Sequence, residues 1–361
     1  MRAGALSRAV RSGAGTVAVA GLALMLGAHP VYADDSRTGG GTGTGGTGTG
    51  GTGTPAAGGD SAKGAVGAHV RITRSTLGSG AATSRATSSD VGWKPPVCWY
   101  EPMYTSREYE EFITSAYAGA GEPAASYAKR RADEDFHKDD KGLWWQVKFR
   151  DDDFSAECPV TTDNWEIWVP PVDPAPDPHK LTPEILSELA YNATVLPTPP
   201  VVLKPGAGRL VVNLGTRVTL DGDFGRVWTT AALDHKGVRM AATTVATPVA
   251  LRVDAGTADA DPRSCTYDLV ERGGGYTVDS AGAGCEVTYR RSSGDAAYPF
   301  RASITWKVTW TDSADPDGPA RAPGLPDGLS TVEQDVTVRE IQALNRARVT
   351  RGSAGRVHRV G

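Results

Sequence analysis

The segment Phe-Arg-Ala-Ser-Ile-Thr-Trp-Lys-Val-Thr-Trp, residues 300–310, alternates apolar and polar side chains along most of its length. In an extended strand, one face would carry Ile304, Trp306, Val308 and Trp310, and the other face would carry Ser303, Thr305, Lys307 and Thr309. One apolar and one polar face are typical of a half-buried strand in an antiparallel sheet. This segment therefore predicts a sheet that covers a hydrophobic core.

Short apolar segments separated by Gly, Pro and Asp turns surround this strand. The expected strands cover residues 201–203, 209–214, 218–220, 227–230, 238–246, 249–253, 285–290, 300–310 and 331–338. Many short strands without intervening helices favour an antiparallel β-sandwich. We therefore expect this sandwich at residues 201–340, followed by a disordered basic tail at 341–361.

Residues 93–170 are predicted to form a small, Trp-rich α+β module. Thr105 and Glu108 have the spacing of a capping box, in which each side chain satisfies a free backbone N–H at the start of a helix. The expected elements are helices at residues 105–117 and 123–136 and strands at residues 143–149 and 164–169. The fold class is therefore mainly β, with a small α+β module before the C-terminal sandwich.

Residues 171–200 are expected to be a Pro-rich spacer that contains one short helix. Thr182 is a good N-cap and Pro183 suits the first helical position, so this helix should cover residues 182–193. Proline recurs at residues 197–200 and prevents the helix from continuing.

The N-terminal region has the composition of an export signal followed by a tether. Residues 1–33 combine early arginines, an uncharged apolar stretch and Val31-Tyr32-Ala33, which is typical of a cleavable signal peptide. Residues 34–92 are rich in Gly, Thr and Ser and include a repeat of Gly-Thr-Gly-Thr-Gly, so we expect a disordered linker. These features predict a secreted protein, in the cell wall or beyond it, without a stable membrane span after cleavage.

The four cysteines fit an oxidising compartment. The chain has an even number of cysteines, namely Cys98, Cys158, Cys265 and Cys285, which favours two disulfides. Three connectivities are possible. The local pairs, Cys98 with Cys158 and Cys265 with Cys285, are favoured because the Pro-rich segment divides the chain between them. Their spacing does not suit a structural metal site.

Several segments of the C-terminal half form a recognisable set. They are the helix at 182–193, Leu-Pro-Thr-Pro-Pro at 196–200, Gly-Arg-Leu-Val-Val-Asn-Leu at 208–214, Ala-Thr-Pro-Val at 246–249, residues 285–293, and the strand with Trp306 and Trp310. With this set, residues 181–338 resemble a family of exported actinobacterial proteins of unknown function.

The last strands are also similar to the sandwich of polycystic-kidney-disease-type (PKD-like) domains, an immunoglobulin-like fold. The likeness lies in Val287-Thr-Tyr289 before the strand at 300–310, whereas Asp254-Ala-Gly256 replaces the Gly-Asp-Gly turn of those domains. The resemblance implies a spacer or binding module on a secreted or surface protein.

The sequence contains no recognisable catalytic motif. The formal net charge of −4 is too small to indicate nucleic acid or an anionic membrane as the main partner. The histidines at 69, 137, 179, 235 and 358 lack metal-ligand spacing and are expected at the surface, and no Gly-x-Ser-x-Gly element is present. We therefore predict no catalytic residue, no metal and no cofactor.

Acidic residues leave two further possibilities open. Runs at 133–135, 139–140 and 151–153 are typical of solvated loops, although paired carboxylates could hydrolyse glycosides. Alternating carboxylates at 221–223, 259–261 and 312–317 could bind calcium, but they lack a complete calcium loop and are more typical of ordinary turns.

The chain has nine tryptophans, several of them in the module. Trp144 and Trp145 should lie on opposite faces of one strand, and Trp165 and Trp168 on opposite faces of another. Exposed, these four rings could stack on sugars; buried, they would form the core of a small domain. The core interpretation is favoured, because a helix could cover the second face.

These observations predict a secreted, non-enzymatic protein that acts as a structural or binding module at the cell envelope. The expected partner is cell-wall polymer or another envelope protein. The alternatives are a glycan-binding protein that uses the four tryptophans and an envelope polysaccharide hydrolase that uses Asp/Glu pairs.

Overall fold

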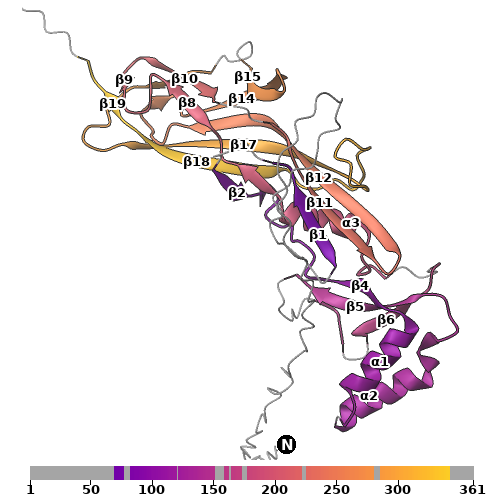
Figure 1. The fold of residues 1–361 in the computed structure, drawn as a ribbon. Helices are drawn as coiled ribbons and strands as arrows, with labels where there is room; N and C mark the ends of the chain where they lie inside the picture. Colours follow the sequence, from indigo (N-terminus) through magenta and orange to yellow (C-terminus); the bar gives the residue numbers. More distant parts are fainter. Residues whose placement is uncertain are drawn as a thin grey trace, which may run out of the picture. The chain divides into compact units, whose positions relative to one another are not determined.

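The computed structural model describes residues 69–76, 82–119, 121–150, 158–161, 164–172, 177–221, 225–279 and 285–341. The expected signal peptide at 1–33, the Gly/Thr repeat and all but the first residue of the expected tail at 341–361 lie outside these residues. The described residues belong to one compact unit. The fold is mainly β, as predicted (Figure 1).

The helical elements are short and few among the described residues. They are α1 (Ser106–Ala116), α2 (Glu122–Asp133), α3 (Pro183–Asn192) and the 3-10 turn η1 (Asp135–His137). The strands of the first half are β1 (Val70–Arg74), β2 (Thr83–Arg85), β3 (Thr87–Ser88), β4 (Cys98–Tyr104), β5 (Leu143–Phe149), β6 (Glu166–Val169) and β7 (Val195–Pro197). Those of the second half are β8 (Val201–Lys204), β9 (Leu210–Val211), β10 (Gly215–Leu220), β11 (Val227–His235), β12 (Val238–Asp254), β13 (Ala260–Asp261), β14 (Ser264–Arg272), β15 (Gly275–Val278), β16 (Val287–Tyr289), β17 (Tyr298–Thr311), β18 (Gly328–Val336) and β19 (Val338–Arg339).

Two antiparallel sheets pack as a sandwich in the C-terminal half. The larger sheet has the order β1-β11-β12-β17-β18-β3, with β14 and β15 attached beside β12, and the smaller one has the order β13-β16-β10-β8. Apolar side chains of both sheets, such as Trp306 of β17 and Tyr289 of β16, share one core. Every second residue of β17 from Phe300 to Trp310 is buried, so the predicted half-buried strand is confirmed.

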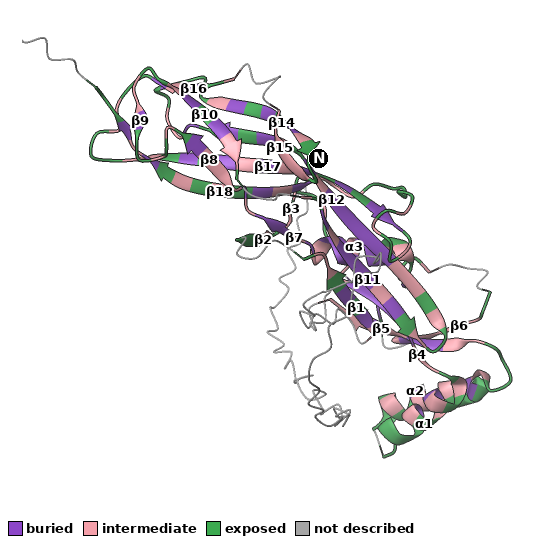
Figure 2. Ribbon diagram, turned by 45° about the horizontal axis from the view of Figure 1, so that its top comes forward, coloured by how far each residue is buried: buried purple, intermediate pink, exposed green. Residues whose placement is uncertain are grey.

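The long strands β11, β12 and β17 extend from the sandwich to α3 (Figure 1). The predicted break between residues 246 and 249 is wrong, because β12 is continuous from Val238 to Asp254. A register shift between Pro248 and Ala250 accommodates the proline, which cannot donate a ladder hydrogen bond. Figure 2 shows buried residues along β12 beyond the sandwich as well as within it.

A second core joins α3 and the module to these long strands. Buried side chains of α3, such as Leu186 and Leu189, pack with Ala231 of β11 and with Trp145 of β5. The N-cap Thr182 accepts a hydrogen bond from the backbone of Ile185, as predicted. The expected short helix within the Pro-rich segment 171–200 is present, and its apolar side chains belong to the hydrophobic core.

Order begins earlier than the expected boundary of the linker at residue 92. Strand β1 pairs with β11, and its Val70 and Ile72 are buried in the second core. The alternation of Val70, Arg71, Ile72 and Thr73 outweighs the low-complexity composition around it. The prediction of disorder was therefore wrong for this part of the linker.

Local signals account for most of the module. The capping box of Thr105 and Glu108 is present in full at the start of α1. The second helix ends at Asp133 rather than at residue 136, because Asp135, Phe136 and His137 have φ values of 49°, 50° and 57° that no helix continues through. The left-handed turn buries Phe136 beneath the helices.

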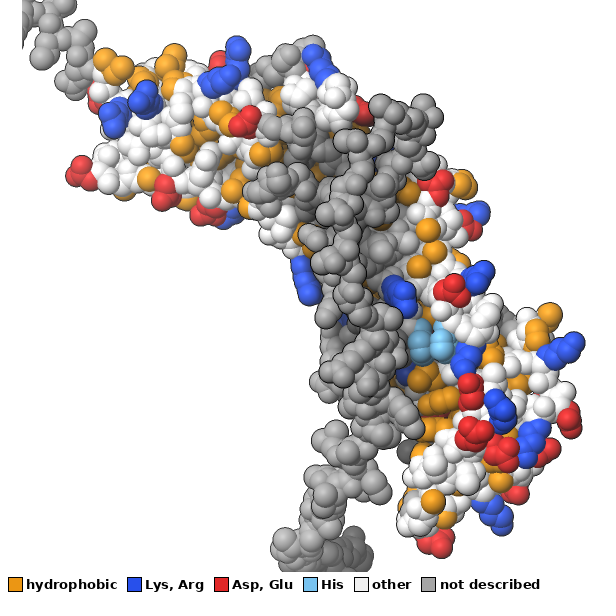
Figure 3. Space-filling model, viewed as in Figure 1, with side chains coloured by type: hydrophobic (Ala, Val, Ile, Leu, Met, Phe, Trp, Pro, Cys, Tyr) orange, Lys and Arg blue, Asp and Glu red, His pale blue; other side chains and the backbone are white. Residues whose placement is uncertain are grey.

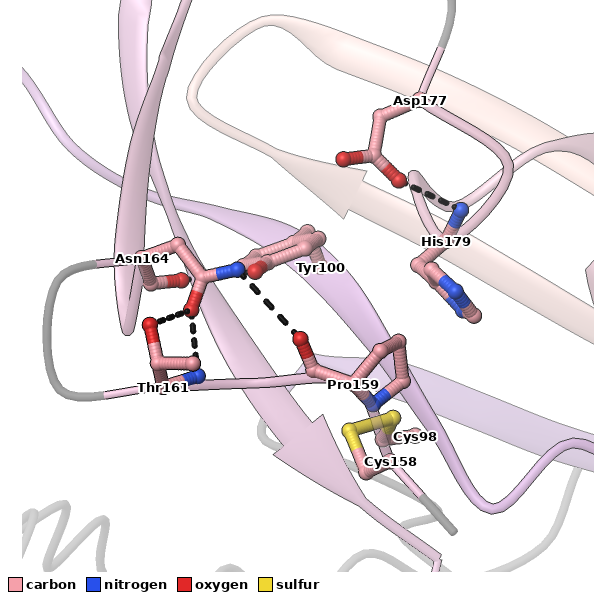
Figure 4. Close-up of a disulfide and its surroundings, with 8 residues drawn as sticks. All are labelled: Cys98, Tyr100, Cys158, Pro159, Thr161, Asn164, Asp177 and His179. Atoms are coloured by element: carbon pink, nitrogen blue, oxygen red, sulfur yellow. Dashed lines mark hydrogen bonds between the residues drawn. A yellow bond between two sulfur atoms is a disulfide. The ribbon is translucent and has the colours of Figure 1, made fainter.

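Both disulfides have the favoured pairing. Cys98 bonds Cys158 and Cys265 bonds Cys285, with sequence separations of 60 and 20 residues. Figure 4 shows the first bridge beside Tyr100 and Asn164. The Tyr100 hydroxyl donates to the Asn164 carbonyl over 2.6 Å, so the segment after Cys158 is tied to β4 twice.

Removing the longer bridge should cost more stability than removing the shorter one. From loop entropy, the variant C98A/C158A should lose about 4 kcal/mol of unfolding free energy. The variant C265A/C285A should lose about 3 kcal/mol. Urea unfolding followed by tryptophan fluorescence would measure both losses. An equal or smaller loss for C98A/C158A would contradict this order.

Candidate functional site

The module contains the clearest concentration of buried polar groups. Strands β4, β5 and β6 form a three-stranded antiparallel sheet, and α1 and α2 lie beside it (Figure 1). Tyr109 and Ile113 of α1, Tyr127 of α2 and Trp144 of β5 form a cluster on one face of this sheet. The helices therefore cover that face.

Three polar side chains cross the sheet on the helix-covered face. Glu101 of β4 pairs with Gln146 of β5, and Gln146 pairs with Glu166 of β6. Directly paired residues project to the same side of a sheet, so these residues form a polar row (Glu101, Gln146 and Glu166). Glu101 and Glu166 are 0% and 2% exposed, which is rare for carboxylates.

Hydroxyl and amide donors surround the Glu166 carboxylate. The Tyr127 hydroxyl donates a short hydrogen bond to Oε2, and the Tyr109 hydroxyl donates to the same oxygen over 3.4 Å. Gln146 Nε2 donates to Oε1 over 3.0 Å. Burial, together with the Glu166 charge, raises the pKa of Tyr127 to about 12 and also raises the pKa of Tyr109. Both hydroxyls consequently stay protonated and able to donate.

Glu101 has its own set of donors at the other end of the polar row. Trp99 Nε1 donates to Oε1 over 2.8 Å, and the backbone N–H of His69 donates to Oε2 over 3.1 Å. Both carboxylate oxygens are thus occupied from within the fold.

Two cations accompany the two carboxylates. Lys148 Nζ donates to Gln146 Oε1 over 2.7 Å, and burial lowers the pKa of Lys148 against the opposing effect of Glu101 and Glu166. Arg131 of α2 donates to the backbone carbonyl of Glu166 over 3.1 Å and lies over the Trp144 ring. The network therefore places Lys148 within electrostatic range of both carboxylates, and it holds Arg131 on the Glu166 backbone.

This arrangement suits packing better than proton transfer to a polymer. A general acid or base must come within hydrogen-bond reach of its substrate, but Glu101 and Glu166 lie beneath other side chains and their oxygens already accept hydrogen bonds. The polar row is a closed network that fixes the register of β4, β5 and β6 and the position of the helices on them.

The four tryptophans singled out by sequence are divided between the two faces of the sheet. Trp144 is 1% exposed among the helices, and Trp145 is 7% exposed in the core shared with α3. Half-buried Trp168 stacks on His137 with 4.4 Å between ring centroids, and half-buried Trp165 lies against Phe149. Each strand thus sends one ring to each face, and the four do not form one row.

The described acidic runs do not converge. The side chains at 133–135 and 139–140 are exposed around the end of α2, while the run at 151–153 lies outside the described residues. The turn carboxylates of Asp312, Asp317 and Asp261 pair with Arg321, Arg226 and Arg290, respectively. Residues 222–223 of the first acidic turn also lie outside the described residues. Among the residues that the structure describes, no three His, Cys, Asp or Glu side chains are arranged to hold a metal ion.

A hollow of about 370 Å³ lies on the sandwich, beside the turn Asp254-Ala-Gly256. Asp254, Arg263 and Arg301 are its charged lining residues. Arg301 also pairs with Glu333. The described lining of the hollow therefore contains one carboxylate, Asp254, and two arginines, and it does not hold the facing pair of carboxylates that a glycosidase uses.

Sequence reasoning missed the polar row and one contact between histidines. His69 and His235 stack with 3.6 Å between their ring centroids, although they were expected as separate surface residues. The signal that could have found the polar row is a single carboxylate inside an aromatic strand: Glu101 follows Trp99 and Tyr100, and Glu166 lies between Trp165 and Ile167. The pairing between those strands could not be read from the sequence.

None of the helices in the described part of the chain has the length and apolar character needed to cross a bilayer. Comparison of the chain with protein-family models, with curated proteins and with solved structures finds no match.

Proposed function

We propose that this chain is an exported, non-enzymatic protein that serves as a structural or binding module at the cell envelope. The signal-like residues 1–33, the Gly/Thr-rich linker and the two disulfides support export. A partner in the envelope, either cell-wall polymer or another envelope protein, suits a folded unit that follows a Gly/Thr-rich segment.

The closed polar row is the observation that carries the non-enzymatic part of this proposal. Glu101 and Glu166 are carboxylates that converge on one face of a sheet, which the hydrolase alternative requires. Their burial and their intramolecular donors support a role in holding the module together. The resemblance to spacer domains of surface proteins agrees with this role.

The test is incubation of the mature protein, residues 34–361 with both disulfides intact, with purified cell-wall polymer. We expect the polymer to release no new reducing ends or other soluble fragments. Release of fragments by the native protein, together with its loss in the folded variant E166Q, would overturn the proposal in favour of a hydrolase.

Glycan binding is the second candidate because Trp165 and Trp168 retain partial exposure. Each ring lies beside another aromatic ring, Phe149 and His137 respectively, so either could widen a platform for a sugar. The two rings lie on opposite faces of the sheet, so only one of them could contribute to a given platform.

If sugar stacking operates, one of the variants W165A and W168A should bind the polymer about tenfold more weakly, which corresponds to roughly 1.4 kcal/mol. W93A is the matched control, because Trp93 is half-buried but packs edge-on against Tyr191 at the sandwich. Sedimentation of the protein with the polymer would measure the change. Equal binding by all three variants would exclude these rings and favour a protein partner.

A further inference from the structure

A cluster of ionisable side chains lies where the long β11–β12 hairpin meets the module. His69 directly precedes β1, and His235 ends β11 before the tight turn at Lys236 and Gly237. Glu101 of β4 and Glu108 of α1 come from the module. We call this group the histidine junction (His69, Glu101, Glu108, His235 and Lys236).

The junction is held by contacts that cross from the hairpin to the module. Lys236 Nζ forms a short ion pair with Glu108 Oε1, and the His69 backbone N–H donates to Glu101. Burial opposes the charge of Glu108, but hydrogen bonds from Lys236 and Thr105 outweigh it and lower the pKa of Glu108 to about 2. This ion pair therefore remains charged under mildly acidic conditions.

The two stacked imidazoles have different charged neighbours. Their rings are nearly parallel, at 15°, with 3.6 Å between centroids. A proton on His69 would face the Glu101 carboxylate, whose Oε2 lies 3.6 Å from Nδ1. That nitrogen is buried and has no hydrogen-bond partner, so protonation would supply a donor next to an acceptor. A second proton, on His235, would place two positive rings in contact.

The surroundings of His235 add to this cost. Burial, the adjacent His69 and the ammonium of Lys236 lower the pKa of His235, although the Met103 backbone and Glu108 partly oppose the shift. Lys236 cannot compensate, because it carries the same charge.

We propose that the His69–His235 stack is an acid-sensitive latch between the β11–β12 hairpin and the α+β module. At neutral pH the two rings stack. In acid, protonation of His235 places a positive ring against His69 and beside the ammonium of Lys236, which loosens the tip of the hairpin from the module. The His69 side chain is 24% exposed, and Figure 3 shows histidine side chains at the surface beside charged groups.

The direction of the effect on stability follows from the pKa of His235. Because the folded value lies below the unfolded value of about 6.5, the unfolded chain binds more protons between the two values. Stability contributed by the neutral ring is fully present above about pH 6.5 and is lost as the pH falls below it. Each pKa unit of difference changes the unfolding equilibrium constant about tenfold.

The first experiment is NMR titration of the histidine ring signals in the mature protein. We expect the His235 ring to titrate below about pH 6.5, the value for a free imidazole, and the ring signals of His69 and His235 to respond to each other, as coupled sites do. A His235 ring that titrates at or above that value, without coupling to His69, would overturn the latch.

The second experiment compares urea unfolding at pH 7.5 and pH 5.0. H235F keeps an aromatic ring for stacking but cannot be protonated, so it should lose less stability in acid than the native protein. H179Q is the control, because His179 makes its hydrogen bonds through the backbone: its N–H donates to Asp177 and its carbonyl accepts from Tyr100. Equal losses in the native protein and H235F would contradict the proposal. If H235F does not fold, the titration of the native protein decides the question alone.

Discussion

Replacement of Glu166 by alanine is expected to lower the free energy of unfolding by about 3–5 kcal/mol, the usual cost of removing one member of a buried charged network. The Tyr127 hydroxyl and the Gln146 amide would lose their acceptor inside the module. Unpaired buried donors are costly because they also lose their bonds to water. Urea unfolding of the mature protein at pH 7.5 would measure the loss.

Two matched variants make this result specific. E166Q keeps a side-chain oxygen at the position and should lose less than E166A. E111A removes a carboxylate from α1 whose side chain is 70% exposed, and it should change stability by less than about 0.5 kcal/mol. If E166A proved as stable as the native protein, the polar row would not be structural. A hydrolytic role for Glu166 would then regain support, since active-site groups often contribute little to stability.

The parts of the fold that sequence predicted are those in which a local pattern carries the information. The alternation in residues 300–310 needs no partner to indicate a half-buried strand, and β17 confirms it. The capping box at Thr105 and the cap at Thr182 are satisfied within one turn of their own helices. The favoured disulfide pairs also followed from local chain order.

The sequence-based prediction was wrong where the structure of a segment depends on a strand that is distant in the sequence. Pro248 indicated the end of a strand, but β12 continues because β17 pairs with it on both sides of the bulge. Val70 and Ile72 lie beside a low-complexity sequence, and their short alternation forms a strand by pairing with the distant strand β11. The hairpin of β14 and β15 was missed, although Cys265, Tyr267 and Leu269 alternate with polar residues and Gly273 and Gly274 mark its turn.

The candidate site was harder still to predict, because it depends on register. Glu101 and Glu166 meet on one face only through β5, which pairs with both β4 and β6. A shift of one residue in either pairing would send one carboxylate to the opposite, apolar face. Single carboxylates between aromatic residues were visible in the sequence, but their common face was not.

Strand β17 supplies side chains to both cores, although these cores lie in regions that sequence assigned to separate domains. Trp306 is 0% exposed within the sandwich and donates from Nε1 to Ser330 Oγ over 3.0 Å. Trp310 lies on the same face of β17 but belongs to the core shared with α3 and the module, and it donates to the Pro323 carbonyl over 2.8 Å. One rigid strand thus connects the sandwich with the module.

Substitution of Trp306 by alanine should therefore destabilise the whole described unit, by about 3–5 kcal/mol. W306F, which keeps most of the buried ring area but loses the bond to Ser330, should lose less. W310A should also be strongly destabilising, whereas T309A, on the exposed face of the same strand, should have little effect. Because β11, β12 and β17 serve both cores, each variant should unfold in one cooperative transition that is seen alike by circular dichroism and tryptophan fluorescence. Two separate transitions in W310A would show that the module unfolds independently, and the shared strands would then connect the cores without coupling them.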